Sequence, residues 1–271
     1  MSAKQPISSS AQAMKSSFAM IAIPIIFVVS VLIYIFVLGS TANFEGGDPV
    51  KGHPLNTFGT IHKGGFIVPF LMTCLLTVIV VTIERFISLG KASGKGNVAD
   101  FVVKIRSLVK NGEIEKGIKE CDAQAGVVAN VTKAGLLKYI EMGKNNELDN
   151  EKKELGIAKD IEEATQLEMP MLEKNLSILA TLASISTLLG LVGTVLGMIR
   201  AFGALATTGT PDTAALATGI SEALINTAFG IFASMLAIIF YNYFTSKIDS
   251  LTYGIDEAGF SIVQSFASKN H

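Results

Sequence analysis

Four long apolar runs constrain this sequence more than any other feature, because each can cross a lipid bilayer as a helix. A helix that crosses the hydrocarbon core needs about 20 largely apolar residues. Charged residues make up only 17% of the 271-residue chain, fewer than in an ordinary soluble domain. The sequence therefore predicts an all-α, polytopic membrane protein with four transmembrane helices, at Phe18–Leu38, Phe66–Ile83, Leu176–Ile199 and Ala214–Phe244.

The first run lies where a cleaved signal peptide would lie, and Thr41-Ala42 offers a small-residue cleavage site. Its apolar stretch is longer than the roughly 7–15 residues of a signal-peptide core. We therefore expect it to be retained as a membrane helix.

The segments between the runs differ in composition. Glycine and proline mark the first as an irregular loop. The second is charged, yet its apolar residues recur at helical spacing, as at Phe101, Ile105 and Leu108, which predicts a small helical domain. The expected organisation is an N-terminal segment with its helix (1–40), a loop (41–65), a second helix (66–89), the helical domain (90–175), the last two helices (176–246) and a C-terminal tail (247–271).

Lysine and arginine near the helix ends predict the orientation, because they accumulate on the cytoplasmic side. By this rule both termini and the helical domain are cytoplasmic, and loop 41–65 is periplasmic. Arg200, at the outer end of the third helix, is an exception whose long stem could reach the interface. The residues on the cytoplasmic side are Lys4, Lys15, Arg85, Lys91, Lys95, Lys174 and Lys247.

The last two helices each carry a stripe of small and hydroxyl-bearing residues on one face. Small residues let helices approach closely in lipid, and hydroxyls can bond across the contact. A hydroxyl both donates and accepts, so the stripes could line an ion path; tight packing alone is the alternative. The candidate packing residues are Gly190, Gly193, Gly197 and Gly230, and the candidate ion-path residues include Thr187, Thr194, Thr227 and Ser234.

Glu222 is the one charged residue of the fourth run, and Asn226 is its i+4 neighbour. An ionisable side chain in a membrane helix is costly and typically faces a bundle interior or a wet cavity. We place Glu222 and Asn226 with the candidate ion-path residues. The alternative is a solvated Glu222 at the outer interface, capping the start of a helix.

Two blocks of sequence resemble the ExbB/TolQ/MotA proton-channel family, and best fit ExbB. Residues 190–199, GLVGTVLGMI, are similar to its G-L-x-G-T-V-x-G-x-I signature, and residues 219–230, GISEALINTAFG, to the block that follows it. Glu84-Arg85 and Tyr241-Asn242 match shorter family features. The resemblance extends from about Phe66 to the C-terminus.

The resemblance implies a ring in the bacterial inner membrane, a homopentamer whose two motif helices line a central pore. It also implies an ExbD-like partner with a membrane aspartate in that pore, and a TonB-like protein that energises outer-membrane transport. By motif position, Thr194, Glu222 and Thr227 match the family's pore-lining residues.

Three departures from the family pattern affect these expectations. Ser186-Thr187 stands where members often have Ala-Pro, and Ser234-Met235-Leu236 where many have a proline in the last helix. The sequence therefore does not determine whether these two helices bend as those of the relatives do. The first helix is additional to the usual three of ExbB, and we expect it on the lipid-facing outside of the ring.

The sequence argues against several other classes of function. No nucleophile–base pair, CxxC or zinc spacing occurs, so we expect neither an enzyme nor a metal or other cofactor. The net charge of -1 shows no excess of basic residues of the kind that binds nucleic acid. His53, His62 and His271 are expected to be solvated. A non-conducting scaffold and a stator of a TolQ-type, gliding or flagellar machine remain alternatives, and protons are favoured over sodium as the coupling ion.

Overall fold

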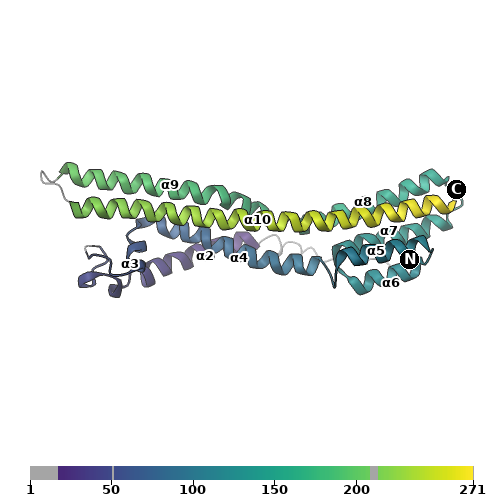
Figure 1. Cartoon of the computed structure of the whole chain (residues 1–271), viewed down its shortest axis with the longest axis horizontal. Helices are drawn as coiled ribbons and strands as arrows, with labels where there is room; N and C mark the ends of the chain where they lie inside the picture. The colour runs from purple at the N-terminus through teal and green to yellow at the C-terminus, as the bar shows by residue number, and fades with distance from the viewer. Residues whose placement is uncertain (1–17, 51, 208–212, 271) are drawn as a thin grey trace. The chain divides into compact units, whose positions relative to one another are not determined.

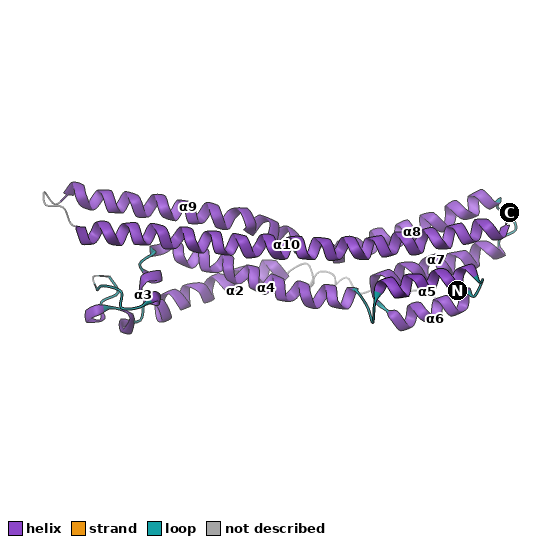
Figure 2. Ribbon diagram, in the orientation of Figure 1, coloured by secondary structure: helices purple, strands orange, loops and turns teal. Residues whose placement is uncertain are grey.

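A computed structural model describes residues 18–50, 52–207 and 213–270 of the chain (Figure 1). Lys4, Lys15, His271 and residues 208–212, which connect the last two predicted helices, lie outside these residues. The described residues form helices and no strand (Figure 2). Four helices are long and apolar enough to cross a membrane, which confirms the predicted all-α polytopic class.

The chain divides into two compact units. Unit 1 draws on residues 1–82 and 177–241, and unit 2 on residues 83–176 and 242–271. Helices α4 (Val68–Ala92) and α10 (Thr213–Asn270) contribute to both units. Because α10 is continuous over 58 residues, no break separates the fourth apolar run from the tail that follows it.

Unit 1 contains α2 (Phe18–Leu32), most of α4, α9 (Leu176–Thr207) and the first half of α10. The first apolar run ends in a π-helical segment, η1 (Ile33–Leu38). The glycine- and proline-rich segment after it is not wholly irregular, since it forms short 3₁₀ helices and the six-residue helix α3 (Thr57–His62). The 3₁₀ helices are η2 (Thr41–Asn43), η3 (Glu45–Gly47) and η4 (Gly65–Ile67).

Unit 2 packs the helices of the polar region against the second half of α10. Asn97 and Asp149 cap two of these helices, accepting hydrogen bonds from Ala99 N (3.0 Å) and Lys152 N (2.8 Å). The apolar residues at helical spacing form the core, with Ile105, Leu136 and Ile157 fully buried. The helices are α5 (Val98–Lys110), α6 (Ile114–Gln124), α7 (Gly126–Lys144) and α8 (Asn150–Glu173).

A buried arginine in unit 2 joins the end of α4 to the break between α8 and α9. Arg85 is 1% exposed; its Nη2 lies 2.6 Å from Glu84 Oε1, and its Nη1 donates to Leu172 O at 3.3 Å. At the break, Asn175 adopts a φ of 62° and donates from Nδ2 to Glu84 Oε2 at 3.2 Å. Asparagine tolerates this left-handed conformation better than most residues.

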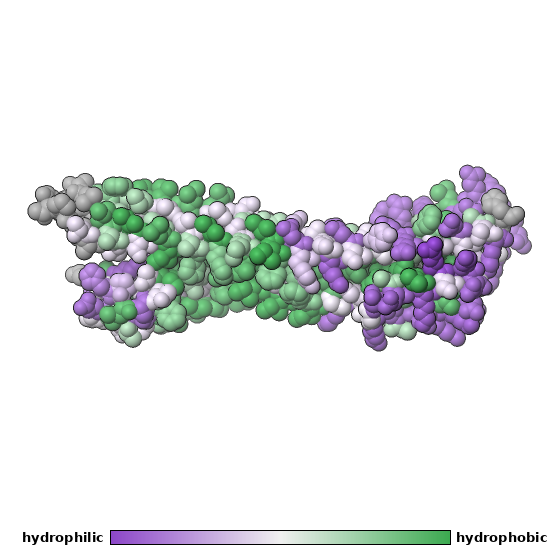
Figure 3. All heavy atoms as spheres, in the orientation of Figure 1, coloured by the Kyte–Doolittle hydropathy of each residue, from purple (hydrophilic) through white to green (hydrophobic). Residues whose placement is uncertain are grey.

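The surfaces of the two units differ in polarity. Hydrophobic residues cover the visible face of the unit 1 helices, whereas hydrophilic residues dominate around α5–α8 (Figure 3). On α9 and α10 many large apolar side chains are exposed, and Leu188, Leu191 and Leu224 are each more than half exposed. A lipid-facing surface of large apolar residues is what a membrane helix requires.

Candidate functional site

Helices α9 and α10 lie side by side in unit 1 (Figure 1) and touch through their backbones. A Cβ on Gly230 would lie 2.5 Å from Ser186 O and 2.9 Å from Gly190 Cα. A Cβ on Gly190 would lie 3.0 Å from Asn226 O. Such an approach is possible only because glycine has no side chain at the contact.

The two other glycines of the stripe lie at the same contact. A Cβ on Gly193 would come within 2.5 Å of Asn226 Cβ, and one on Gly197 within 2.9 Å of Ala223 Cβ. All four glycines singled out from the sequence therefore face α10 or α9.

Two threonine hydroxyls meet in the middle of this contact. Thr194 Oγ1 and Thr227 Oγ1 are in hydrogen-bonding contact, and either can be the donor. Backbone carbonyls surround them: Gly190 O lies 3.2 Å from Thr194 Oγ1, and Ala223 O lies 3.3 Å from Thr227 Oγ1. Each hydroxyl has one proton and several acceptors within reach, so the proton of either can be redirected by rotation about the C–O bond.

The remaining candidate ion-path residues do not join the threonine pair. Ser234 donates its hydroxyl to Ala183 O, across the α9–α10 contact. Asn226 is 1% exposed and donates from Nδ2 to Gly64 O at 2.9 Å, while its Oδ1 has no hydrogen-bond partner among the described residues. Thr187 is exposed on α9.

Glu222 forms an ion pair with Arg200, a partner that the sequence analysis missed. The carboxylate is buried, with 7% of the residue exposed, and its Oε1 contacts Arg200 Nη1 from α9. The guanidinium carbon of Arg200 lies 5.9 Å from the centroid of the Phe66 ring, within the range of a cation–π contact. Glu222 is therefore not the solvated cap weighed as the alternative, and Arg200 does not simply extend away from the helix.

A positional signal in the sequence could have revealed this pair. In a helical hairpin, residues at similar distances from the turn face each other. Arg200 with Glu222, and Thr194 with Thr227, are each placed almost symmetrically about residues 207–213. Arg200 and Glu222 are also the charged residues of their helices nearest to that turn.

The end of the preceding loop closes over the ion pair. Gly65 has a φ of 75°, a conformation that favours glycine, and a Cβ there would lie 2.6 Å from Glu222 Oε1 and 2.9 Å from Arg200 Nη1. Together with the bond from Asn226 to Gly64, this contact fixes the Gly64-Gly65 corner against α9 and α10.

The expectation of a solvated His62 is wrong. Its ring is half-buried and stacks on Tyr34 at a centroid distance of 4.5 Å, and Phe44 meets it edge-on at 5.4 Å. Burial, and secondarily the charge of Lys63, holds the pKa of His62 below its usual range. His62 is therefore neutral at neutral pH and serves to pack the loop.

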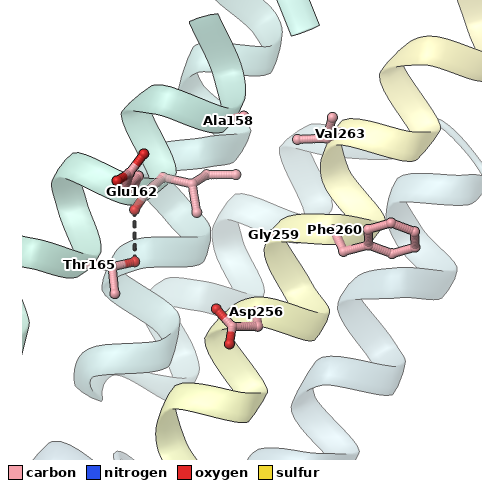
Figure 4. Close-up of a pocket in the computed structure, with 8 residues that line it drawn as sticks. Ala158, Glu162, Thr165, Asp256, Gly259, Phe260 and Val263 are labelled. Carbon is pink, nitrogen blue, oxygen red and sulfur yellow. Dashed lines mark hydrogen bonds between the residues drawn. The ribbon is translucent and has the colours of Figure 1, made fainter. Parts of the chain in front are cut away.

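Unit 2 contains a separate groove of about 400 Å³ between α8 and α10 (Figure 4). Its lining is mostly apolar, and Glu162 and Asp256 contribute carboxylates to it. Among the described residues, no group of three or more His, Cys, Asp or Glu side chains could hold a metal ion. The groove lining comprises Ala158, Ile161, Glu162, Thr165, Asp256, Gly259, Phe260 and Val263.

Comparisons with known proteins identify relatives of the region that carries the site. The Tol-Pal system protein TolQ of Pseudomonas aeruginosa is 36% identical over 130 residues, which cover 48% of this chain and 56% of that protein. The biopolymer transport protein ExbB of Pseudomonas putida is 25% identical over 217 residues, covering 78% and 63%. ExbB of Salmonella typhimurium is 44% identical over 72 residues, covering 27% and 30%. The chain spans less than two thirds of the length of each of these relatives.

Residues 124–257 match the MotA/TolQ/ExbB proton channel family. The matched segment includes both threonines and both members of the ion pair. Residues 124–257 of this chain therefore carry a domain of the MotA/TolQ/ExbB proton channel family.

Proposed function

We propose that the chain is a proton-channel stator subunit of the ExbB type in the bacterial inner membrane, with both termini in the cytoplasm. Five copies form a ring, and an ExbD-like subunit with a membrane aspartate occupies its pore. The complex uses the proton gradient to energise, through a TonB-like protein, transport across the outer membrane. The observation that carries this proposal is the contact of the Thr194 and Thr227 hydroxyls between α9 and α10, inside the family segment.

The chain supplies only part of an ion path, which supports the need for a partner. Glu222 is the only acidic residue between Thr213 and Phe244. Hydroxyls relay a proton without carrying charge themselves, since each accepts one proton as it donates another. A second acid is needed to bind and release the proton at the level of the threonines, and the partner's aspartate provides it.

The proposed place of the first helix follows from its surface. Val28, Val29 and Leu32 on α2 are each more than 40% exposed. We assign α2 to the lipid-facing outside of the ring. Cross-links between Val28 and pore residues would contradict this assignment.

We expect Thr227→Val to leave the complex assembled and to reduce proton flux at least about tenfold, a barrier increase of about 1.4 kcal/mol. Valine keeps the shape of the side chain and removes its only proton donor. The measurement is proton uptake into liposomes that contain the chain purified with its ExbD-like partner, after the mass of the intact complex has been determined. Thr181→Val is the matched control, because Thr181 is exposed on α9 and donates its hydroxyl to Ser177 O of its own helix.

Glu222→Gln is expected to abolish flux in the same assay. Wild-type flux in both Thr227→Val and Glu222→Gln would rule out the ion path and leave a non-conducting scaffold as the function. A stoichiometry other than five copies would overturn the pentamer alone.

A TolQ-type stator is the second candidate, because TolQ of Pseudomonas aeruginosa matches the segment that carries the site. Expression in bacteria that lack their own ExbB, and separately in bacteria that lack TolQ, distinguishes the two. We expect restored TonB-dependent uptake in the first strain. Rescue of the envelope defect in the second strain alone would assign the chain to a Tol-Pal system.

A further inference from the structure

In the ion pair between Arg200 and Glu222, one partner is buried and the other is partly exposed. The Glu222 side chain is 9% exposed, whereas the Arg200 side chain is 46% exposed. The carboxylate also lies under the Gly65 backbone, as the 2.6 Å from a Gly65 Cβ to Glu222 Oε1 shows. Glu222 therefore cannot turn outward without moving the loop, whereas Arg200 can leave the contact by rotating its own side chain.

Several charged or titratable groups face Glu222 from the elements packed against it. Arg200 on α9 is in contact, and Lys63, just before the Gly64-Gly65 corner, adds a second positive charge nearby. Tyr34 on η1 also interacts with it electrostatically. Burial of Glu222 favours the neutral carboxylic acid, whereas both nearby cations oppose this and favour the carboxylate, since opposite charges stabilise the ionised form.

A guanidinium remains charged at every physiological pH. While Arg200 contacts the carboxylate, an arriving proton meets a fixed positive charge and a carboxylate oxygen that is already occupied. Separation of the pair frees that oxygen. The proton then binds Glu222 Oε1 to give a neutral carboxylic acid, and Arg200 keeps its charge in water, so that the net charge rises by the one proton taken up.

We propose that Arg200 is a positioning residue that keeps the ion path closed: it holds Glu222 as a carboxylate and must separate from it before Glu222 takes up a proton. This proposal rests on the proposed function, in which Glu222 belongs to the ion path. It adds a closed state that is set by a residue on α9 rather than by the partner subunit.

The test is a pH titration of Glu222 by infrared spectroscopy, on the full chain purified with its partner and placed in lipid. The signal is the absorbance of the protonated carboxyl group that Glu222→Gln removes. We expect Arg200→Gln to move the appearance of this signal to higher pH by about 1–3 units. Arg200→Lys, which keeps the charge, is expected to stay close to the wild type.

Lys63→Gln is the matched control, because it removes a cation that lies near Glu222. Its shift is expected to be smaller than that of Arg200→Gln. An unchanged titration in Arg200→Gln, an equal shift in Lys63→Gln, or a Glu222 signal absent at every pH in both wild type and Arg200→Gln would each overturn the proposal.

A second pair of variants tests whether the Gly64-Gly65 corner of the loop holds the ion pair together. Gly65→Ala is expected to force the ion pair apart and to move the titration in the same direction as Arg200→Gln. Gly46→Ala carries the same backbone strain, since its φ is 70°, but no atom lies within 4 Å of the added Cβ. Equal titrations in the two alanine variants would show that the Gly64-Gly65 corner does not keep Arg200 and Glu222 in contact.

The infrared titration needs no transport, so its outcome is separate from that of the proposed function. If the complex conducts protons but Arg200→Gln does not shift the Glu222 titration, only the proposed role of Arg200 is contradicted. A chain that shows the Arg200 effect but conducts nothing contradicts the stator function and leaves the ion pair as described.

Discussion

Replacing Arg85 by alanine is expected to destabilise unit 2 by about 1–3 kcal/mol, because it removes charge-assisted hydrogen bonds and leaves the partly exposed carboxylate of Glu84 without its counter-charge. Arg85 is 1% exposed and makes two contacts of 2.6 and 2.7 Å with the Glu84 carboxylate. It also binds Leu172 O at the end of α8. The measurement is reversible unfolding in mixed micelles, followed by circular dichroism.

Arg106→Ala is the matched control for this effect. Arg106 is 67% exposed and lies 4.0 Å from Glu257, and exposed pairs of this kind contribute about 0–1 kcal/mol. The double variant Glu84→Gln with Arg85→Met is expected to recover much of the lost stability, since removing both charges leaves no unpaired carboxylate. If Arg85→Ala loses no more unfolding free energy than Arg106→Ala, the contacts of Arg85 do not stabilise unit 2.

Gly230→Ala is expected to destabilise the α9–α10 contact by about 1–3 kcal/mol, the usual cost of overpacking. The added methyl group would meet the backbone at Ser186 O and Gly190 Cα, and backbone atoms cannot move aside as side-chain ends can. Gly203→Ala is the control, because no atom lies within 4 Å of its Cβ position. There alanine is expected to be neutral or slightly stabilising, since it favours the helix over glycine.

The same unfolding measurement compares the two alanine variants. Equal stability of Gly230→Ala and the wild type would mean that α9 and α10 separate at little cost. In that case the threonine contact would not be held by the glycines on either side of it.

The sequence predicted the four membrane helices well, because long apolar runs have few alternative structures. It also indicated which faces of α9 and α10 carry small and hydroxyl-bearing residues, since helical spacing alone determines a face. The roles of Thr194, Thr227 and Glu222 in an ion path stay predictions until flux is measured.

The sequence did not predict the partners of the charged residues, because these depend on contacts between distant segments. Arg200 binds Glu222 across the hairpin, and Gly65 covers both from a loop whose path no periodicity defines. His62 was misjudged for the same reason, since its burial comes from Tyr34 in another segment. Glu84-Arg85 was noted only as a family feature, and its contacts with Leu172 and Asn175 follow from tertiary structure.

The contact between α9 and α10 has a thermodynamic consequence. It is formed by glycines and hydroxyls, while Leu188, Leu191 and Leu224 are each more than half exposed. Little apolar surface leaves water when such helices meet in lipid, so their association has a small heat capacity change. The strength of a leucine-filled interface in water declines on cooling. The α9–α10 contact is expected to keep nearly the same strength across the growth temperatures of a bacterium.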